Sequence, residues 1–143
     1  MARTQPYPVC NFLVEWGGTS MGFAEIDGLS TEIETVDYRE GSSKTLSPVK
    51  IASLSKVFDV TLKRGLVADP QLYQWFDVQR SGVDTPRDVI ITLLDEADKP
   101  VLRWILQTCR PRRIGWSRLG ANSGEVAMEE LVLSCERLTL EIP

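Results

Sequence analysis

Few residues in this sequence have the chemistry that catalysis or metal binding requires. It contains three cysteines, Cys10, Cys109 and Cys135, and no histidine. Without histidine, neither a Ser-His-Asp triad nor a Cys-His nucleophile can be built. Three scattered thiols are also too few for a zinc site, and in a reducing compartment we expect them to be small buried side chains. The sequence therefore predicts a protein that is not an enzyme and that uses no cofactor or metal.

Carboxylates cluster at 95–98, between the apolar runs 89–94 and 101–106. They could serve acid–base chemistry or bind calcium. However, Asp, Lys and Pro are ordinary turn residues, and the Asp-x-Asp-x-Asn-Gly spacing of a calcium loop is missing. The cluster therefore predicts a hairpin turn. A second tight bend is expected at Gly17 and the glycine that follows it, after which residues 22–26 can pair back against residues 10–16.

Four arginines and Trp116 lie within the segment RPRRIGWSR, residues 110–118. Such a cluster could contact nucleic acid through charge and stacking. It could instead form a loop whose arginines pair with carboxylates of a neighbouring subunit, such as Glu32, Glu34 or Asp37. The net charge of −4 favours the subunit interface.

Composition indicates one folded domain spanning residues 1–143. Hydrophobic residues make up 43% of the chain and charged residues 25%, values typical of folded proteins. No apolar run approaches the roughly 18 residues that a membrane span needs, and the N-terminus has no apolar signal segment. We expect assembly in the cytoplasm.

The remaining chain is predicted to be mainly strands, at 10–16, 22–26, 30–40, 57–64, 87–94, 100–108 and 125–142. The last strand loses its alternation near 131–133, where a bulge is expected. A polar, poorly patterned arm is expected at about 41–56. The predicted fold class is mainly β: an antiparallel β-sandwich or partial barrel with one short helix.

The helix is expected at about 70–80. Asp69 suits the N-cap and Pro70 the first helical position. Leu72, Trp75 and Phe76 follow at helical spacing, so they should face the core.

The segments 30–40 and 57–64 are long and lack proline, so as edge strands they would expose unpaired backbone groups. Pairing with other copies, head to tail, would satisfy these groups and could close a ring. A ring of strands is a barrel that can enclose a water-filled bore. Polar residues at every second position, among them Glu32 and Glu34, would suit that bore.

Four segments carry a family resemblance. FAEIDGLSTEIETVDYREG, 23–41, is similar to the F-x-E-V-S-G-L-x-x-E-x-E-x-x-x-Y-R-E-G stretch of phage-tail-like tube proteins. VTLKRGLVADPQLYQWF, 60–76, resembles their strand, K-R-G turn and helix. RDVIITLLDEADKPVLRWILQTCRPRR, 87–113, resembles their hairpin, and LGANSGEVAMEELVLSCERL, 119–138, their last strand. The sequence thus resembles inner tube subunits of contractile injection systems, relatives of phage tail tubes and type VI secretion tubes.

This resemblance implies a structural subunit whose hexameric rings stack into a hollow tube, with strands completing one large β-barrel per ring. The implied partners are copies of itself, a contractile sheath protein, baseplate and tube-terminating proteins, and effector cargo in the lumen. Nucleic acid would be a partner only in a true phage. The particle could be a phage tail, a released device or a membrane-anchored one. The arm would extend against the adjacent ring.

Two alternatives remain open: an adaptor ring that starts the tube at the baseplate, and a monomeric β-sandwich that binds a ligand through Trp16 or Trp116. For the tube subunit, contacts between subunits are expected at Glu32, Glu34, Asp37, Tyr38, Arg39, Glu40, Lys44, Pro48, Lys50, Lys63, Arg64, Arg110, Arg112, Arg113 and Arg118.

Overall fold

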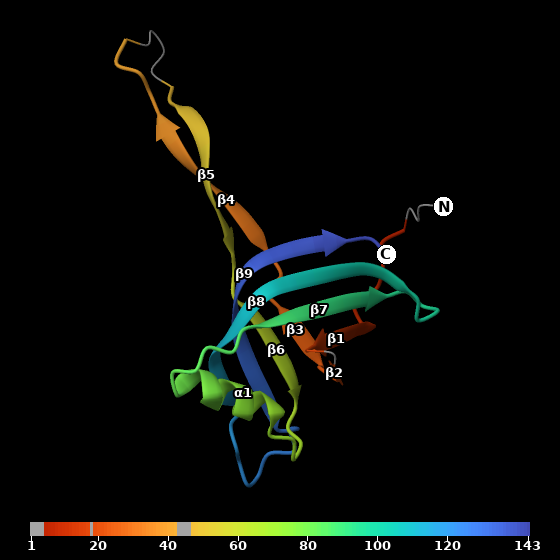
Figure 1. Cartoon of the computed structure of the whole chain (residues 1–143). Coiled ribbons are helices and arrows are strands. Elements are labelled where there is room, and N and C mark those ends of the chain that lie inside the picture. The colour runs from red at the N-terminus through yellow and green to blue at the C-terminus, as the bar shows by residue number, and fades with distance from the viewer. Residues whose placement is uncertain (1–4, 18, 43–46) are drawn as a thin grey trace.

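The computed structural model describes residues 5–17, 19–42 and 47–143. A curved sheet carries one helix over one end, and a long two-stranded hairpin projects away from it (Figure 1). The elements in chain order are β1 (Phe12–Trp16), β2 (Thr19–Met21), β3 (Glu25–Asp27), β4 (Thr31–Tyr38), β5 (Val49–Val57), β6 (Val60–Gly65), α1 (Gln71–Arg80), β7 (Arg87–Leu94), β8 (Pro100–Trp116) and β9 (Met128–Glu141).

The main sheet has seven strands in the order β2-β1-β7-β8-β9-β6-β3, and each neighbouring pair is antiparallel. The expectation of a mainly β fold with a partial barrel and one short helix is confirmed. The turn expected at 95–98 is also confirmed. There the Asp95 carboxylate accepts hydrogen bonds from the backbone N–H of Ala97 (2.8 Å) and Lys99 (2.9 Å).

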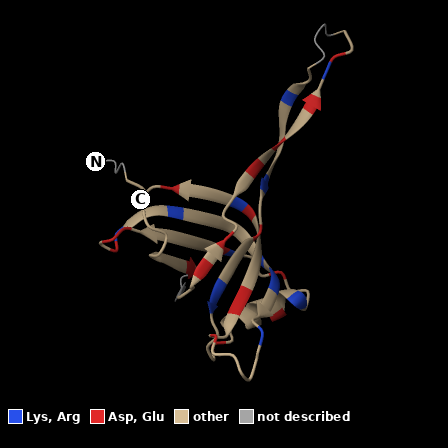
Figure 2. Cartoon of the chain, turned by 180° about the vertical axis from the view of Figure 1, so that it is seen from behind, with Lys and Arg blue, Asp and Glu red and all other residues tan. Residues whose placement is uncertain are grey.

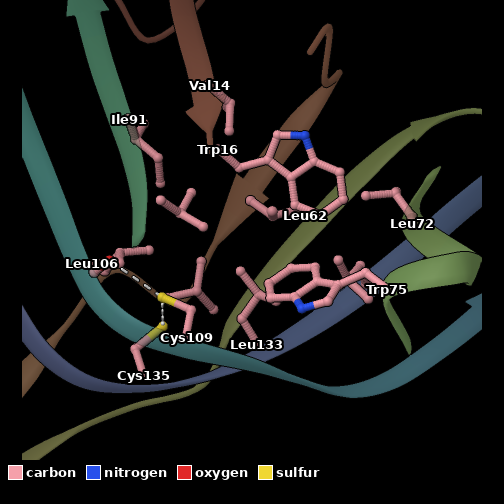
Figure 3. Packing of buried hydrophobic residues seen from close by; sticks show 13 residues of the cluster. Val14, Trp16, Leu62, Leu72, Trp75, Ile91, Leu106, Cys109, Leu133 and Cys135 are labelled. Carbon is pink, nitrogen blue, oxygen red and sulfur yellow. Dashed lines mark hydrogen bonds between the residues drawn. The ribbon is translucent and has the colours of Figure 1, made fainter. Parts of the chain in front are cut away.

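The core lies on the inner face of this curved sheet. Cross-strand pairs bring apolar side chains of β1, β6, β7, β8 and β9 together, and the helix adds Leu72 and Trp75 (Figure 3). Cys109 and Cys135 are buried there, as expected, but Cys10 is exposed and that part of the prediction is wrong. The core reaches from the sheet to the helix, where Trp16 of β1 meets Trp75 of α1 edge-on at 4.9 Å between ring centroids.

The helix expected at about 70–80 is confirmed as α1, but its N-cap residue is Pro70 rather than Asp69. Of the three apolar residues expected to face the core, only Leu72 and Trp75 are buried. Asp69 acts at its start, because one carboxylate oxygen accepts from the Gln71 N–H at 3.1 Å. The Gln74 N–H donates to the Pro70 carbonyl at 2.8 Å, which is the first helical bond. Trp75 is 2% exposed, and its Nε1 donates to the Thr85 carbonyl at 2.7 Å.

The pairing expected for 22–26 is wrong. The chain does bend after Trp16, with Gly17 at φ 59°, but the strand that returns along β1 is the shorter β2. Residues 25–27 instead form β3, which pairs with β6 on the opposite edge of the sheet. Sequence alternation gave no information about which partner this short strand would take.

The segment 57–64 is not a single edge strand. It divides after Val57, and β6 lies inside the sheet between β9 and β3. The chain changes direction at 58–59, where the hairpin meets the sheet. Gly28 lies against this junction at φ 91°, and a Cβ there would lie 2.3 Å from the Asp59 carbonyl oxygen. Only glycine fits without moving the backbone.

The expectation of a poorly patterned arm at about 41–56 is also wrong. Residues 49–57 form β5, which pairs with β4 from Thr31↔Val57 to Tyr38↔Val49. The projecting element is therefore the β4–β5 hairpin, 31–57, rather than a strand followed by an arm.

The arginine-rich segment is a strand, not a loop, because β8 continues to Trp116 along β9. A bulge was expected in β9 near 131–133. The structure has a bulge opposite these residues, but it is β8 rather than β9 that contains the additional residue. Pro111 pairs with Leu133 and Arg113 with Val132, which leaves Arg112 without an opposite residue in this register.

Candidate assembly surfaces

The β4–β5 hairpin exposes large hydrophobic side chains. All residues of β4, and all of β5 except Val57, are exposed. A two-stranded hairpin is at best marginally stable in water by itself. Its large apolar residues are between about half and three quarters exposed: Ile33 63%, Val36 54%, Tyr38 50%, Val49 63%, Ile51 49% and Leu54 71%.

Register places four of these residues on one face of the outer half of the hairpin. Val36 lies opposite Ile51, and Tyr38 lies opposite Val49. Residues two apart in a strand, and residues directly opposite each other, share a face. We call these four residues the apolar face.

The reverse side of the same stretch is mostly polar. There Thr35 pairs with Ala52, and Asp37 pairs with Lys50. Figure 2 shows acidic residues along β4 and basic residues along β5. The outer hairpin is therefore amphipathic, although no part of the described chain covers its apolar face.

Strand edges with unpaired backbone N–H and C=O groups are longer in the hairpin than in the main sheet. The sheet ends in the three-residue strands β2 and β3, and short edge strands limit unwanted pairing. In the described part of the chain, β4 and β5 form a separate two-stranded sheet. Each of them therefore has one long side without a strand beside it.

The arginines of β8 have acidic partners within the chain rather than Glu32, Glu34 or Asp37. Arg110 contacts both oxygens of Asp84 (2.7 and 3.0 Å) and Glu136 (2.9 Å). This guanidinium lowers the pKa of Asp84 below its ordinary value, with a smaller contribution from Gln79.

The other arginines of the segment follow the same pattern. Arg112 pairs with Asp59, and Arg113 pairs with Glu130 at 3.1 Å. Arg118 lies beyond the strand near Gly120. The in-chain pairs account for the charge of Arg110, Arg112 and Arg113 without a neighbouring subunit.

Arg64, expected at an interface, is buried and 5% exposed. Its Nε donates to Glu129 Oε1 at 2.9 Å, and a terminal nitrogen donates to the Asp69 carbonyl at 3.0 Å. Glu129 is 3% exposed, and its other oxygen accepts from Trp116 Nε1 at 3.1 Å. This buried network joins β6, β9 and the start of α1, so Arg64 is a structural residue of the single chain.

The remaining predicted contact residues are on the surface. Lys63 pairs in-chain with Glu25 at 3.3 Å. Exposed residues of the hairpin and its tip are Glu32, Glu34, Asp37, Tyr38, Arg39, Glu40, Pro48 and Lys50. Lys44 lies outside the described residues. The sequence prediction missed Val36, Val49 and Ile51, although the patterns V-x-Y and V-x-I in two facing strands were a signal for them.

The described parts of the chain contain neither a candidate metal site nor a candidate membrane-spanning helix. Among those residues, no group of three His, Cys, Asp or Glu could hold a metal ion, and no helix is long and apolar enough to cross a membrane. Of the two aromatic residues that the monomeric alternative could use, Trp16 is 5% exposed and so cannot serve as an exposed ligand-binding residue, whereas Trp116 is 50% exposed.

The comparisons with known proteins agree with this arrangement. Residues 8–139 match the family model described as T4-like virus tail tube protein gp19. The chain belongs to this family. It is a structural tail tube subunit of a contractile injection system or phage tail, and not an enzyme. It is part of a phage tail or extracellular injection particle.

Chains in solved structures of two injection particles, and an Hcp protein, have a similar fold. A chain of the PVC sheath-tube complex in its extended state gives a TM-score of 0.89 at 22% identity, with 98% of this chain and 94% of that chain covered. A chain of the anti-feeding prophage baseplate gives 0.86 at 27% identity, with 97% of both covered. Hcp1 from Flavobacterium johnsoniae gives 0.58 at 8% identity, with 93% and 96% covered. The curated proteins gave no match.

Proposed function

We propose that this tail tube subunit forms hexameric rings that stack into the inner tube, and that the β4–β5 hairpin of each subunit docks on the next ring. The amphipathic hairpin is the observation that supports the proposal most directly. A projecting hairpin with an exposed apolar face is at best marginally stable by itself, and exposed apolar surfaces usually mark protein contacts. The occupant that we infer is a second copy of this chain.

Symmetry supports the choice of a second copy. The similar anti-feeding prophage baseplate is described as 6-fold symmetrised. If every subunit has the same projecting hairpin, head-to-tail contacts along the axis repeat without end and give a tube. Docking would also satisfy the long open sides of β4 and β5.

The partners proposed for the assembled tube are those named from the resemblance: a contractile sheath, a baseplate, a tube terminator and cargo in the lumen. Similar chains come from a sheath-tube complex, a baseplate and a tube-terminating cap. The likeness to a baseplate chain also favours a second candidate, an adaptor ring that starts the tube. An adaptor should form one ring and then stop.

Adjacent residues of β5 provide a matched test. Ile51 is on the apolar face, whereas Ala52 is exposed on the reverse face. We expect Ile51→Lys to abolish tube growth, because a charge would be buried at the docking site. Ala52→Lys should preserve it, because that side remains polar.

Negative-stain micrographs of the concentrated protein measure the outcome. Long hollow tubes from the parent chain and Ala52→Lys, and isolated rings or monomers from Ile51→Lys, are expected. Tubes of equal length from both variants would refute docking through the apolar face. Parent protein that stops at single rings would favour the adaptor.

A further inference from the structure

Two buried cysteines face each other across the centre of the sheet. Cys109 of β8 and Cys135 of β9 are directly opposite in the antiparallel register. Their sulfur atoms lie 2.9 Å apart and point toward each other (Figure 3). Directly opposite residues have Cα atoms about 4.5–5.5 Å apart, and a disulfide needs roughly 4.4–6.8 Å. The backbone can therefore accept a bond between these sulfurs without rearrangement.

The surroundings of the two thiols differ. Cys109 is fully buried, and its thiol also contacts the Leu106 carbonyl oxygen at 3.4 Å. Cys135 is 8% exposed. The hydrogen bond between the thiols, together with burial, raises the pKa of Cys109, while the same hydrogen bond lowers the pKa of Cys135. Cys135 is thus both the more accessible thiol and the one that ionises more readily.

We propose that Cys109 and Cys135 are a modification site, at which an intrachain disulfide closes when the folded protein meets a small disulfide oxidant. The Cys135 thiolate attacks one sulfur of the oxidant and releases one thiolate as leaving group. Cys109, after losing its proton, then attacks the Cys135 sulfur of this mixed disulfide and releases the second thiolate. The oxidant disulfide is reduced to two thiols, and the two cysteines are oxidised to one S–S bond.

The bond would join β8 to β9, which are adjacent strands inside the seven-stranded sheet. It would close a loop of roughly 25 residues, and cross-links of that span stabilise mainly by restricting the unfolded chain. We expect the melting temperature to rise by roughly 5–10 °C. Closure needs only the folded chain and an oxidant, so it does not depend on tube assembly.

The test uses the full chain with Cys10→Ser, which removes the exposed thiol. The folded protein is incubated with oxidised glutathione, alkylated, digested with trypsin without reductant and examined by mass spectrometry. The expected product is peptide 104–112 linked to peptide 119–137, with the intact chain lighter by two hydrogen masses. The melting temperature should rise and return to its starting value when dithiothreitol is added.

Cys135→Ala in the same background is the control, and its melting temperature should not respond to the oxidant. Since the parent chain retains Cys10, its glutathionylation shows that the oxidant is active. Two thiols that stay unlinked after the folded protein has met the oxidant, and that are both alkylated once the oxidant is removed and the chain is unfolded, would overturn the proposal. So would a glutathione adduct that persists on Cys135, or a linked peptide that forms only in urea.

Discussion

Replacing Arg64 with methionine tests whether the buried charge network holds the helix end of the sheet together. The substitution keeps an apolar stem of similar length but removes the guanidinium. Glu129, which is 3% exposed, would keep its hydrogen bond from Trp116 Nε1 but lose its bond from Arg64 Nε. The Asp69 carbonyl at the start of α1 would lose its donor as well.

The magnitude follows from burial. Removing one partner of a buried ion pair typically costs about 3–5 kcal/mol, because the other charge is left uncompensated. For a chain of this size, that loss lowers the melting temperature by about 10–20 °C. The exposed pair between Arg113 and Glu130 provides a control: the Arg113 side chain is 65% exposed, so Arg113→Met should cost less than about 1 kcal/mol.

Thermal unfolding followed by circular dichroism, on unassembled protein at low concentration, is the appropriate assay. A double variant, Arg64→Met with Glu129→Met, separates an unpaired charge from lost packing, since it should recover most of the stability of the parent chain. A melting temperature for Arg64→Met within 2–3 °C of the parent, about what an exposed pair costs, would refute the reasoning.

Three further changes test other parts of the fold. Trp75→Ala should lower the free energy of unfolding by about 3–5 kcal/mol, because it empties a site that is 2% exposed; an unchanged melting temperature would contradict this packing. Gly28→Ala should lower the free energy of unfolding by more than about 1 kcal/mol, because it adds a Cβ at positive φ against a backbone carbonyl. Gly41→Ala is the control: a Cβ there has open space, so the free energy of unfolding should hardly change in the same assay. Arg110 lowers the pKa of Asp84, so their ion pair should stabilise the folded state at pH values above the ordinary pKa of Asp, near 4. This stabilisation should be lost as the pH falls through the lowered pKa of Asp84. Arg110→Ala should raise the Asp84 pKa in an NMR titration, and an unchanged pKa would exclude the pairing.

Local sequence signals predicted the elements that depend on local interactions. Asp69 and Pro70 mark the helix start, and the spacing of Leu72 and Trp75 identifies its buried side. The β7–β8 turn was equally clear, because Asp95 caps the backbone of its own loop. In these cases the interacting atoms lie within a few residues of each other.

The errors concern pairing between segments that are distant in sequence. Nothing local indicates that β5 returns along β4, or that Arg64 meets Glu129 across 65 residues. Arg64 was expected at a contact between subunits. Its actual position depends on a partner that only the β6–β9 register supplies. The apolar face was missed for the same reason, since its two halves meet only when the hairpin forms.

Hydrogen exchange measured by mass spectrometry, comparing assembled tubes with unassembled subunits, tests the central proposal most directly. If the hairpin docks on a neighbouring ring, amides on the outer sides of β4 and β5 should exchange far more slowly in tubes, while those buried in the β8–β9 pair should change little. Hairpin amides that exchange equally fast in tubes and in free subunits would contradict it.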